Sequence, residues 1–281
     1  MIKKILVPTD YSPSSLNAAE TAIQIARNNN ALVQILHVTD DNCYMIEDEY
    51  REKARHVFDA MSGNIRQKYG VPTEIIFSEG TAGPIITKIA FENNPDLIVM
   101  GAYGISGKGD TFIGSNAHYV IRHAECPVLI MPEGKKAQGF MNVLYPVRPD
   151  RGRLRQFGIV KDITAGGGPC YFEILAILDG KDASEAGCLS AIINTVEQEM
   201  SGNEKVKISL SYNNDMNIPE EVLQKTSDIN ADLLIISSTI DAADKENYIG
   251  PFSREIIDRV QIPFLSVRKP ADNLTSNGAA N

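Results

Sequence analysis

A glycine-rich stretch from Gly101 to Ser115 has the residue types and the spacing to hold a phosphate group. Gly101 and Gly104 are three positions apart, and the pair Gly114-Ser115 follows after nine further residues. Glycine adopts φ values that other residues avoid and lets a backbone approach a ligand closely, so we expect both uses at Gly101 and Gly104. Gly114 and Ser115 open a segment with helical spacing, and the unpaired N–H groups and dipole of a helix N-terminus attract anions.

The flanking residues place this stretch between a strand and a helix. The run from Asp96 to Met100 is short, apolar and bounded by Pro95 and Gly101, which is typical of a buried strand in a parallel sheet. Open α/β sheets bind their ligands outside the carboxyl ends of such strands. The pattern therefore favours phosphate capture, although neither G-x-x-x-x-G-K-S/T nor G-x-G-x-x-G is present. A glycine-rich surface loop with chance spacing is the alternative.

The rest of the first half alternates strands with helices. Ser12, Ser14 and Ser15 offer caps for the first helix, whose apolar residues recur at helical spacing. We expect strands at 2–7, 31–38, 73–77, 96–100 and 128–131, and helices at 16–26, 46–69, 82–93 and 115–123. This order predicts a parallel sheet with helices on both faces, in which the strand ends near Asp10 and Val38 share one edge with the glycine stretch.

The second half of the chain repeats the first. Residues 143–146 echo 5–8, and a shift of 136 positions superposes Pro263 on Pro127 and Gly250 on Gly114. The predicted fold class is α/β, with two tandem doubly wound parallel five-stranded sheets. We expect units at 1–134 and 141–270, a polar linker around 133–141, and a small, polar, disordered tail at 271–281.

Gly101, Gly104, Gly114 and Ser115 match the pattern G-x-x-G-(nine residues)-G-S/T without a gap, and the stretch closely resembles the ATP-binding loop of the universal stress protein family. The run RHA-x-CPVL at 122–129 is similar to the end of the same domain. The resemblance implies an adenine nucleotide alpha-hydrolase-like fold that holds ATP in a crevice. It leaves open whether Mg²⁺ is bound together with the ATP. It also implies a role in stress response or growth arrest.

The same resemblance implies which residues hold the nucleotide. Asp10 and the backbone at Val38 would hold the adenosine end, and the phosphates would be held by Gly104, Gly114, Ser115 and Asn116. The expected binding residues are Pro8, Thr9, Asp10, Val38, Met100, Gly101, Gly104, Gly114, Ser115 and Asn116. Taken alone, Asp10 could equally cap the turn that follows it, and Ser115 could be a plain helix N-cap.

The second half departs from this pattern at most of these positions. The replacements are Val147 for Thr9, Arg148 for Asp10, Ser237 for Gly101, Ile240 for Gly104 and Pro251 for Ser115. A β-branched residue resists the left-handed backbone that glycine adopts, and a proline has no N–H group for a phosphate. We therefore predict that the second half keeps the fold and does not bind ATP as the first half does.

Residues suited to catalysis are few near the glycine stretch. Lys108 and Asp110 lie in its spacer, and His118 lies one helical turn beyond Ser115, where a surface histidine is the simpler interpretation. We therefore expect ATP to act as a ligand or switch with little or no turnover, read by a protein partner that the sequence does not identify. A slow ATPase or nucleotidyl-transfer enzyme of the same fold group and a partner-binding scaffold with vestigial sites are the alternatives.

Association within the chain is a further expectation. In the resembled family the last strands of two domains commonly pair, so residues 128–131 and 263–267 could pair here as a built-in pseudo-dimer. The sequence also leaves open whether two such chains associate into a homodimer.

Composition bounds the class of protein. A net charge of −9 and a pI near 5.0 disfavour a general nucleic-acid binder. The four cysteines lack the spacing of a disulfide framework or a zinc site, and no apolar run approaches a membrane span, so we expect a cytoplasmic protein. The arginine cluster is either an anion site or a solvated helix face; its members are Arg148, Arg151, Arg153 and Arg155.

Overall fold

The computed structural model describes the greater part of both halves. The described residues are 1–39, 56, 63–104, 113–134, 139–147, 157–166, 169–178, 185–199, 205–212, 218–237 and 250–267. Of the predicted helix at 46–69, residues 63–69 are helical and most of the remainder lies outside the described part, as do the tail at 271–281 and linker residues 135–138.

The first half contains five strands and three bounded helices in the described residues. The strands are β1 (Lys4–Pro8), β2 (Leu32–Thr39), β3 (Thr73–Glu79), β4 (Leu97–Gly101) and β5 (Val128–Met131). The helices are α1 (Pro13–Asn29), α3 (Ala82–Asn93) and α4 (Ser115–His123). The bounds of α3, α4 and β5 are those predicted from the sequence, and the ends of the other strands differ from the predicted ones by at most two residues.

The second half supplies the matching set of elements. Its strands are β6 (Asn142–Val147), β7 (Tyr171–Leu178), β8 (Lys205–Tyr212), β9 (Leu233–Ser237) and β10 (Phe264–Val267). Its helices in the described residues are α5 (Phe157–Thr164), α6 (Glu185–Glu199), α7 (Ile218–Asp228) and α8 (Pro251–Arg259). The starts of α7, β9, α8 and β10 follow those of α3, β4, α4 and β5 by 136 positions, which is the shift read from the sequence.

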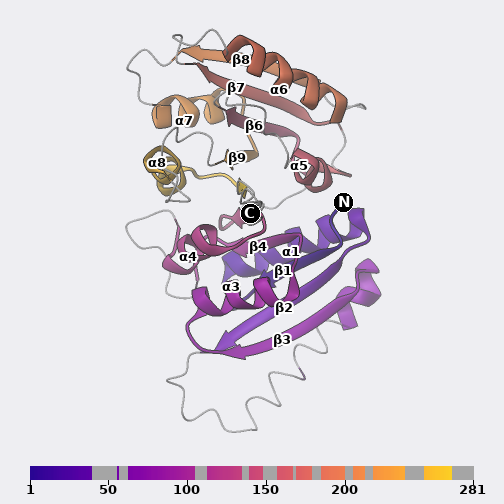
Figure 1. The fold of residues 1–281 in the computed structure, drawn as a ribbon. Coiled ribbons are helices and arrows are strands. Elements are labelled where there is room, and N and C mark those ends of the chain that lie inside the picture. The colour runs from indigo at the N-terminus through magenta and orange to yellow at the C-terminus, as the bar shows by residue number, and fades with distance from the viewer. Residues whose placement is uncertain are drawn as a thin grey trace, which may run out of the picture.

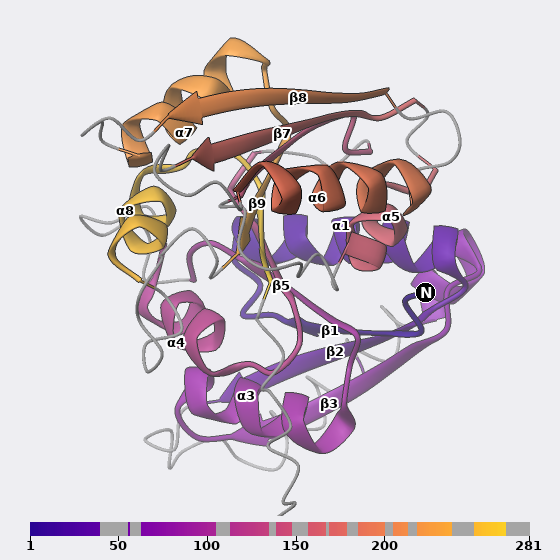
Figure 2. The same ribbon diagram turned by 45° about the horizontal axis from the view of Figure 1, so that its top comes forward.

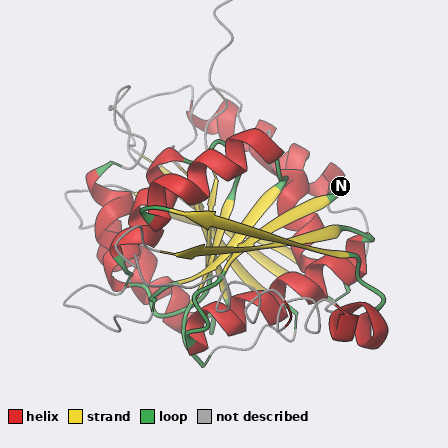
Figure 3. Cartoon of the chain, turned by 90° about the horizontal axis from the view of Figure 1, so that it is seen from below, coloured by secondary structure: helices red, strands yellow, loops and turns green. Residues whose placement is uncertain are grey.

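All ten strands join in one sheet, in the order β3-β2-β1-β4-β5-β10-β9-β6-β7-β8 (Figure 1). Every neighbouring pair is parallel except β5 and β10, so the sheet consists of two parallel five-stranded halves. Helices cover both faces (Figure 3). The predicted α/β class with doubly wound parallel sheets is confirmed, and the two sheets are continuous with each other.

The two halves repeat each other in their hydrogen bonds as well as in their elements. In the first half the carboxylate of Asp96 accepts from the N–H groups of Lys3 and Lys4, at 2.7 and 2.9 Å. In the second half the carboxylate of Asp232 accepts from Met141 and Asn142, at 2.9 and 3.0 Å. In each copy this carboxylate ties the start of the fourth strand to the start of the first.

The junction between the halves has local two-fold character. Strand β5 pairs antiparallel with β10, and Leu129 lies opposite Leu265, which is its own counterpart 136 positions later. A contact between equivalent residues is the mark of an isologous, two-fold interface. The pairing of these two strands is the one that the family resemblance implies.

Contacts on both faces of the sheet hold this junction. On one face α1 lies beside α5 (Figure 2), and the side-chain amides of Asn28 and Asn29 donate to the carbonyls of Ala165 and Asp162, at 2.6 and 2.8 Å. On the other face Nε2 of His118 in α4 lies 2.9 Å from a carboxylate oxygen of Asp258 in α8.

Two apolar clusters fill the space between the sheet and its helices. One cluster lies under α1, α5 and α6, and the other lies under α3, α4, α7 and α8. None of the helices in the described residues is long and apolar enough to cross a bilayer. Cys126, Cys170 and Cys188 are free thiols, and Cys43 lies outside the described part.

A carboxylate is buried inside the second half. Glu173 in β7 is fully buried, and its Oε1 lies 2.8 Å from Nζ of Lys225 in α7 while its Oε2 lies 4.0 Å from Nζ of Lys207 in β8. Ser209 also donates a hydrogen bond to this carboxylate. Burial alone would raise the pKa of Glu173, and the contacts with Lys225, Ser209 and Lys207 outweigh it, so the pKa lies below its ordinary value.

The corresponding position of the first half carries a neutral side chain. Gln34 in β2 occupies the register position of Glu173, and its Nε2 donates to Glu74 of the neighbouring strand at 2.9 Å. Both copies therefore keep a polar side chain at this buried position, but its hydrogen-bonding and charged partners differ between them.

Stability of the second half should depend on the charge of Glu173. Because the pKa of Glu173 is lowered on folding, its stabilising contribution is present above the unfolded-state pKa and is lost as pH falls through the folded-state pKa. We expect Glu173→Gln to lower the free energy of unfolding by about 1–3 kcal/mol at pH 7, because Lys225 loses its ion pair. Urea unfolding at several pH values measures this free energy. The difference between the unaltered protein and Glu173→Gln should disappear below about pH 4. An equal gap at all pH values would contradict the assignment.

Candidate functional site

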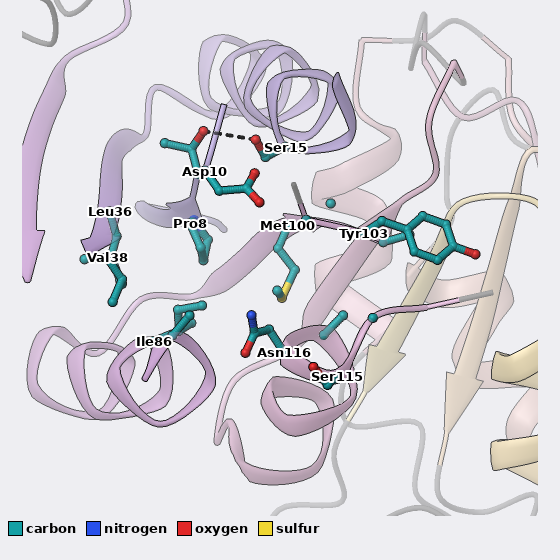
Figure 4. Close-up of a pocket in the computed structure, with 17 residues that line it drawn as sticks. Pro8, Asp10, Ser15, Leu36, Val38, Ile86, Met100, Tyr103, Ser115 and Asn116 are labelled. Atoms are coloured by element: carbon teal, nitrogen blue, oxygen red, sulfur yellow. Dashed lines mark hydrogen bonds between the residues drawn. The ribbon is translucent and has the colours of Figure 1, made fainter. Parts of the chain in front are cut away.

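A pocket opens at the carboxyl ends of β1, β2 and β4 (Figure 4). It encloses about 630 Å³ of empty space including its mouth. The structure brings all ten of the residues expected from the sequence to this one pocket: Pro8, Thr9, Asp10, Val38, Met100, Gly101, Gly104, Gly114, Ser115 and Asn116. Their role in binding stays a prediction.

The inner wall of the pocket is apolar. Leu36 and Val38 of β2 face it from one side, Ile86 of α3 from below, and Met100 of β4 from the back (Figure 4). A wall of this kind suits a flat, weakly polar group such as a heterocyclic base. Leu36 and Ile86 were not expected from the sequence. The two-residue period of β2 places Leu36 on the same face as Val38, and this was the available signal.

Gly101 lets α1 approach the end of β4 closely. A Cβ at Gly101 would lie 2.6 Å from Oγ of Ser14 and 2.8 Å from both the carbonyl carbon of Ser14 and the amide nitrogen of Ser15. The hydroxyl of Ser14 donates to the carbonyl of Met131 at 3.1 Å and accepts from the N–H of Tyr103 at 3.4 Å. The first turn of α1 is thereby held against the strands that form the back of the pocket.

The expectation about the backbone of these glycines is wrong. Neither Gly101 nor Gly104 has a φ in the left-handed region. Both are needed for space: at Gly101 the neighbour is α1, and at Gly104 a Cβ would lie 2.6 Å from Oδ2 of Asp10. The close approach is therefore made to other parts of the protein, which the sequence alone does not reveal.

Asp10 is fixed by the turn that leads into α1. Its Oδ1 accepts from the N–H and the hydroxyl of Ser12, at 3.0 and 2.6 Å. The Ser12 hydroxyl also caps α1, because it accepts from the N–H of Ser15 at 3.2 Å. Beside them the hydroxyls of Thr9 and Ser15 lie 3.1 Å apart (Figure 4). The turn-capping role considered for Asp10 is therefore present, and it also holds the half-buried carboxylate at the pocket.

The N-terminus of α4 forms another side of the pocket. Gly114 is the N-cap and Ser115 is the first helical residue, so the alternative that Ser115 is the N-cap is wrong. The N–H of Gly114 donates to the carbonyl of Ala102 at 2.7 Å. Ser115, Asn116 and Ala117 follow it along the pocket, and Ser115 and Asn116 are exposed.

Three helix N-termini converge on this pocket. Ser15 belongs to the first turn of α1, Ala82 starts α3, and Ser115 starts α4, and all three residues line it. Each helix N-terminus carries roughly half of a positive charge. The one carboxylate among the described lining residues is Asp10, which lies beside the N-terminus of α1, so the α4 side of the pocket suits an anion.

The two N-termini of α3 and α4 are also bonded to each other. Oδ1 of Asn116 accepts from the N–H of Gly83, in the first turn of α3, at 3.2 Å. Thr81, the N-cap of α3, makes no side-chain capping bond of its own. Asn116 was expected at the site, but the sequence does not indicate this contact, because it joins residues 33 positions apart.

Other candidate residues lie elsewhere. His118 points to Asp258 of α8 and does not line the pocket. Lys108, Asp110 and the four arginines of the 148–155 cluster lie outside the described residues.

The equivalent place in the second half is built differently. Gly250 is the N-cap of α8, as Gly114 is of α4, but the first helical residue is Pro251, which has no N–H group. Ser237 stands at the position of Gly101 and hydrogen bonds to the hydroxyl of Tyr145. Burial raises the pKa of Tyr145 to about 12, against the lowering effect of that bond. Arg148 and Ile240 lie outside the described residues.

Replacement of Gly101 tests the packing of α1. We expect Gly101→Ala to lower the free energy of unfolding by about 1–3 kcal/mol, because its Cβ would meet the backbone of α1. Urea denaturation measures the effect. Gly187→Ala in α6 is the matched control, since a Cβ there meets no atom within 4 Å and the change should be neutral or stabilising. Equal stability of the two variants would show that the contact is not tight in solution.

Comparisons with known proteins agree with this architecture. The model of the universal stress protein family matches residues 1–132. A universal stress protein of Methanocaldococcus jannaschii is 32% identical over 146 residues, covering 48% of this chain and 85% of the relative. Universal stress protein YxiE of Bacillus subtilis is 32% identical over 147 residues, covering 47% and 99%.

The fold of the whole chain also has a solved counterpart. The crystal structure of a universal stress protein from Archaeoglobus fulgidus aligns with a TM-score of 0.68 at 20% identity, covering 96% of this chain and 97% of that one. This likeness shows the fold alone, and the relatives above show the family. The chain belongs to the universal stress protein family.

Proposed function

We propose that the first half of this protein binds ATP in the pocket described above and uses it as a ligand or switch, with little or no turnover. The observation that carries the proposal is a single pocket that joins an apolar wall and the Asp10 carboxylate to the N-terminus of α4. A nucleotide has the same division, because a flat base and a hydroxylated sugar precede a strongly anionic tail.

The adenosine end fits the wall formed by β1 and β2. The base would lie against Leu36, Val38 and Ile86, where apolar contact favours a planar ring. The carboxylate of Asp10 accepts hydrogen bonds only, so it suits the hydroxyl groups of a ribose. Ser12 holds that carboxylate in place before any ligand arrives, which lowers the entropic cost of binding.

The phosphate end fits the N-terminus of α4. The N–H groups of Ser115, Asn116 and Ala117 belong to the first turn of that helix, where no carbonyl four residues earlier is available to them. The hydroxyl of Ser115 adds a donor. We do not assign the N–H of Gly114 to the ligand, because it is bonded to Ala102.

A ligand role is favoured over catalysis by the described lining. Phosphoryl transfer needs cations on the transferred group and a residue that positions the attacking water. The described lining residues include no lysine, arginine or histidine, and Asp10 is already engaged by Ser12. Bound ATP would then act by ordering the protein surface around the pocket. A protein partner could bind the ordered surface and not the disordered one.

The second half completes the proposal as a non-binding copy. Pro251 and Ser237 remove a phosphate donor and the close approach that glycine allows. We retain the units 1–134 and 141–270 and the built-in pseudo-dimer as parts of this proposal.

Mass spectrometry of the purified protein is the direct test, with ATP expected as a co-purifying ligand. After its removal, added ATP should raise the melting temperature, because a ligand at one hundred times its Kd stabilises by about 2.7 kcal/mol. Adenosine and inorganic phosphate should each do less. Absence of any nucleotide effect would leave a partner-binding scaffold as the function. Release of radiolabelled phosphate with Mg²⁺, abolished in Asp10→Ala, would establish an ATPase instead.

Replacement of Gly104 tests the site without disturbing the core. We expect Gly104→Ala to weaken ATP binding at least tenfold, because its Cβ would displace the Asp10 carboxylate from Ser12. Stability should change by less than about 1 kcal/mol, since the displaced atom ends a side chain. Isothermal titration calorimetry and urea unfolding measure the two quantities, with Gly187→Ala again as the control. Unchanged ATP affinity would separate Asp10 from the binding site.

A further inference from the structure

A second pocket, which we call the junction pocket, lies where the two halves of the chain meet. It encloses about 790 Å³ of empty space including its mouth, compared with 630 Å³ for the proposed ATP pocket. Its described walls are the C-terminal half of α1, Tyr69, the linker residues Gly139 and Phe140, and the end of α5. Of the described residues, none lines both pockets. The junction pocket is therefore a separate site.

The two sides of the junction pocket differ in chemistry. The first half contributes polar side chains from successive turns of α1, which are Thr21, Gln24 and Arg27. The second half contributes Ile163 of α5, which stands where Arg27 does after the shift of 136 positions. Equivalent positions thus carry a cation on one side of the pocket and an apolar side chain on the other. A ligand that fits both sides has a charged end and an apolar body.

The apolar part of the pocket includes a residue of the linker. Ile25, Phe140 and Ile163 are buried in one apolar cluster, and Tyr69 packs against the same cluster. Gly139 has a φ of 102°, in the left-handed region that favours glycine, so the linker turns there and places Phe140 in the cluster. Two aliphatic side chains and two aromatic rings suit the hydrocarbon part of a ligand.

Arg27 supplies the charge of the polar side. Its side chain is exposed and makes no hydrogen bond or ion pair with the residues that the structure describes. No aspartate or glutamate is present in the described lining, and the carboxylate of Asp162 in α5 lies 2.9 Å from the amino group of Met1. A guanidinium group binds a carboxylate through two parallel hydrogen bonds. The charge at this pocket is therefore available to an anionic ligand.

A hydrogen bond between the halves closes the pocket beside Arg27. Nδ2 of Asn28 donates to the carbonyl of Ala165 at 2.6 Å, and both residues line the pocket. Gly166 follows with a φ of 86°, and a Cβ on it would lie 2.5 Å from the same nitrogen. Because α1 and α5 lie side by side here (Figure 2), a molecule in this pocket would contact both halves.

We propose that the junction pocket binds a small organic carboxylate, with its carboxylate on Arg27 and its apolar body on Phe140 and Ile163. The inference does not rest on the proposed function, because the two pockets share no described residue. Both α1 and α5 end at this pocket, and the dipole of a helix C-terminus disfavours an anion. The apolar contact must therefore supply part of the affinity, so acetate and inorganic phosphate should bind poorly.

Phenylacetate is a suitable probe, and the uncharged phenylacetamide has nearly the same shape. We expect phenylacetate to give saturable NMR shifts at the backbone amides of Asn28, Ala165 and Gly166 in the ¹⁵N-labelled protein. Phenylacetamide should bind about tenfold more weakly, because it lacks the charge that pairs with Arg27. Acetate and inorganic phosphate should give no saturable shift at the same concentrations. Saturating ATP should leave the phenylacetate titration unchanged.

Two arginine variants test the role of the cation. Arg27→Gln should lower the phenylacetate affinity about tenfold, to that of phenylacetamide, and leave phenylacetamide unaffected. Arg122→Gln is the matched control and should change neither affinity. Both arginines are exposed and lie in the last turn of a helix, where the dipole favours a positive charge, but Arg122 does not line the pocket.

Several results would overturn the inference. They are the absence of saturable shifts at the three amides, equal affinities for phenylacetate and phenylacetamide, and equal losses in the two arginine variants. Displacement of phenylacetate by ATP would also overturn it, since the probe would then occupy the other pocket. A protein that binds phenylacetate as expected but does not bind ATP would refute the proposed function and leave this inference standing.

Discussion

The close contact between the first turn of α1 and the end of β4 is the constraint on which the site depends. A Cβ at Gly101 would overlap Ser14 and Ser15, so a side chain there would force α1 away from the sheet. This contact sets the position of the Ser12 cap, and the cap in turn holds Asp10. The Asp10 carboxylate and the N-terminus of α1 therefore keep their place at the pocket because α1 is packed against the sheet.

In the second half that constraint is released. Ser237 takes the place of Gly101, and its hydroxyl is used internally by Tyr145. Pro251 starts α8 where Ser115 starts α4, and Phe252 and Pro219 replace the bonded pair of Asn116 and Gly83. The strands, the Asp232 carboxylate and the N-cap glycine are all kept. The residues that the two halves share in building the fold are therefore different from the residues in which their pocket regions differ.

Much of the fold and the membership of the pocket could be predicted from the sequence. Apolar runs bounded by glycine or proline indicated β4 and β5, and the helical spacing after Gly114 indicated α4 with its correct bounds. The pocket residues followed from the family resemblance together with the rule that parallel strands end at one edge. The pairing of β5 with β10 also came from the resemblance, because no local pattern specifies it.

Contacts between distant parts of the chain could not be predicted. The sequence reveals the conformational freedom of Gly101 and Gly104 but not the atoms beside them, so the expected left-handed backbone was wrong and steric closeness is the actual reason. In the same way, a hydrogen bond from Gly83 to Asn116 leaves no periodic signal. The capture of the Gly114 N–H by Ala102 depends on how the loop folds back after β4.

The pairing of Leu129 with Leu265 has a consequence for how this architecture evolves and operates. Two separate copies that met through this contact would carry identical sites and would come apart on dilution. Covalent linkage removes the dependence on concentration and frees each copy to change alone. Under the proposed function, one copy would bind the ligand while its twin serves as a permanent scaffold, so that each molecule would carry a single site.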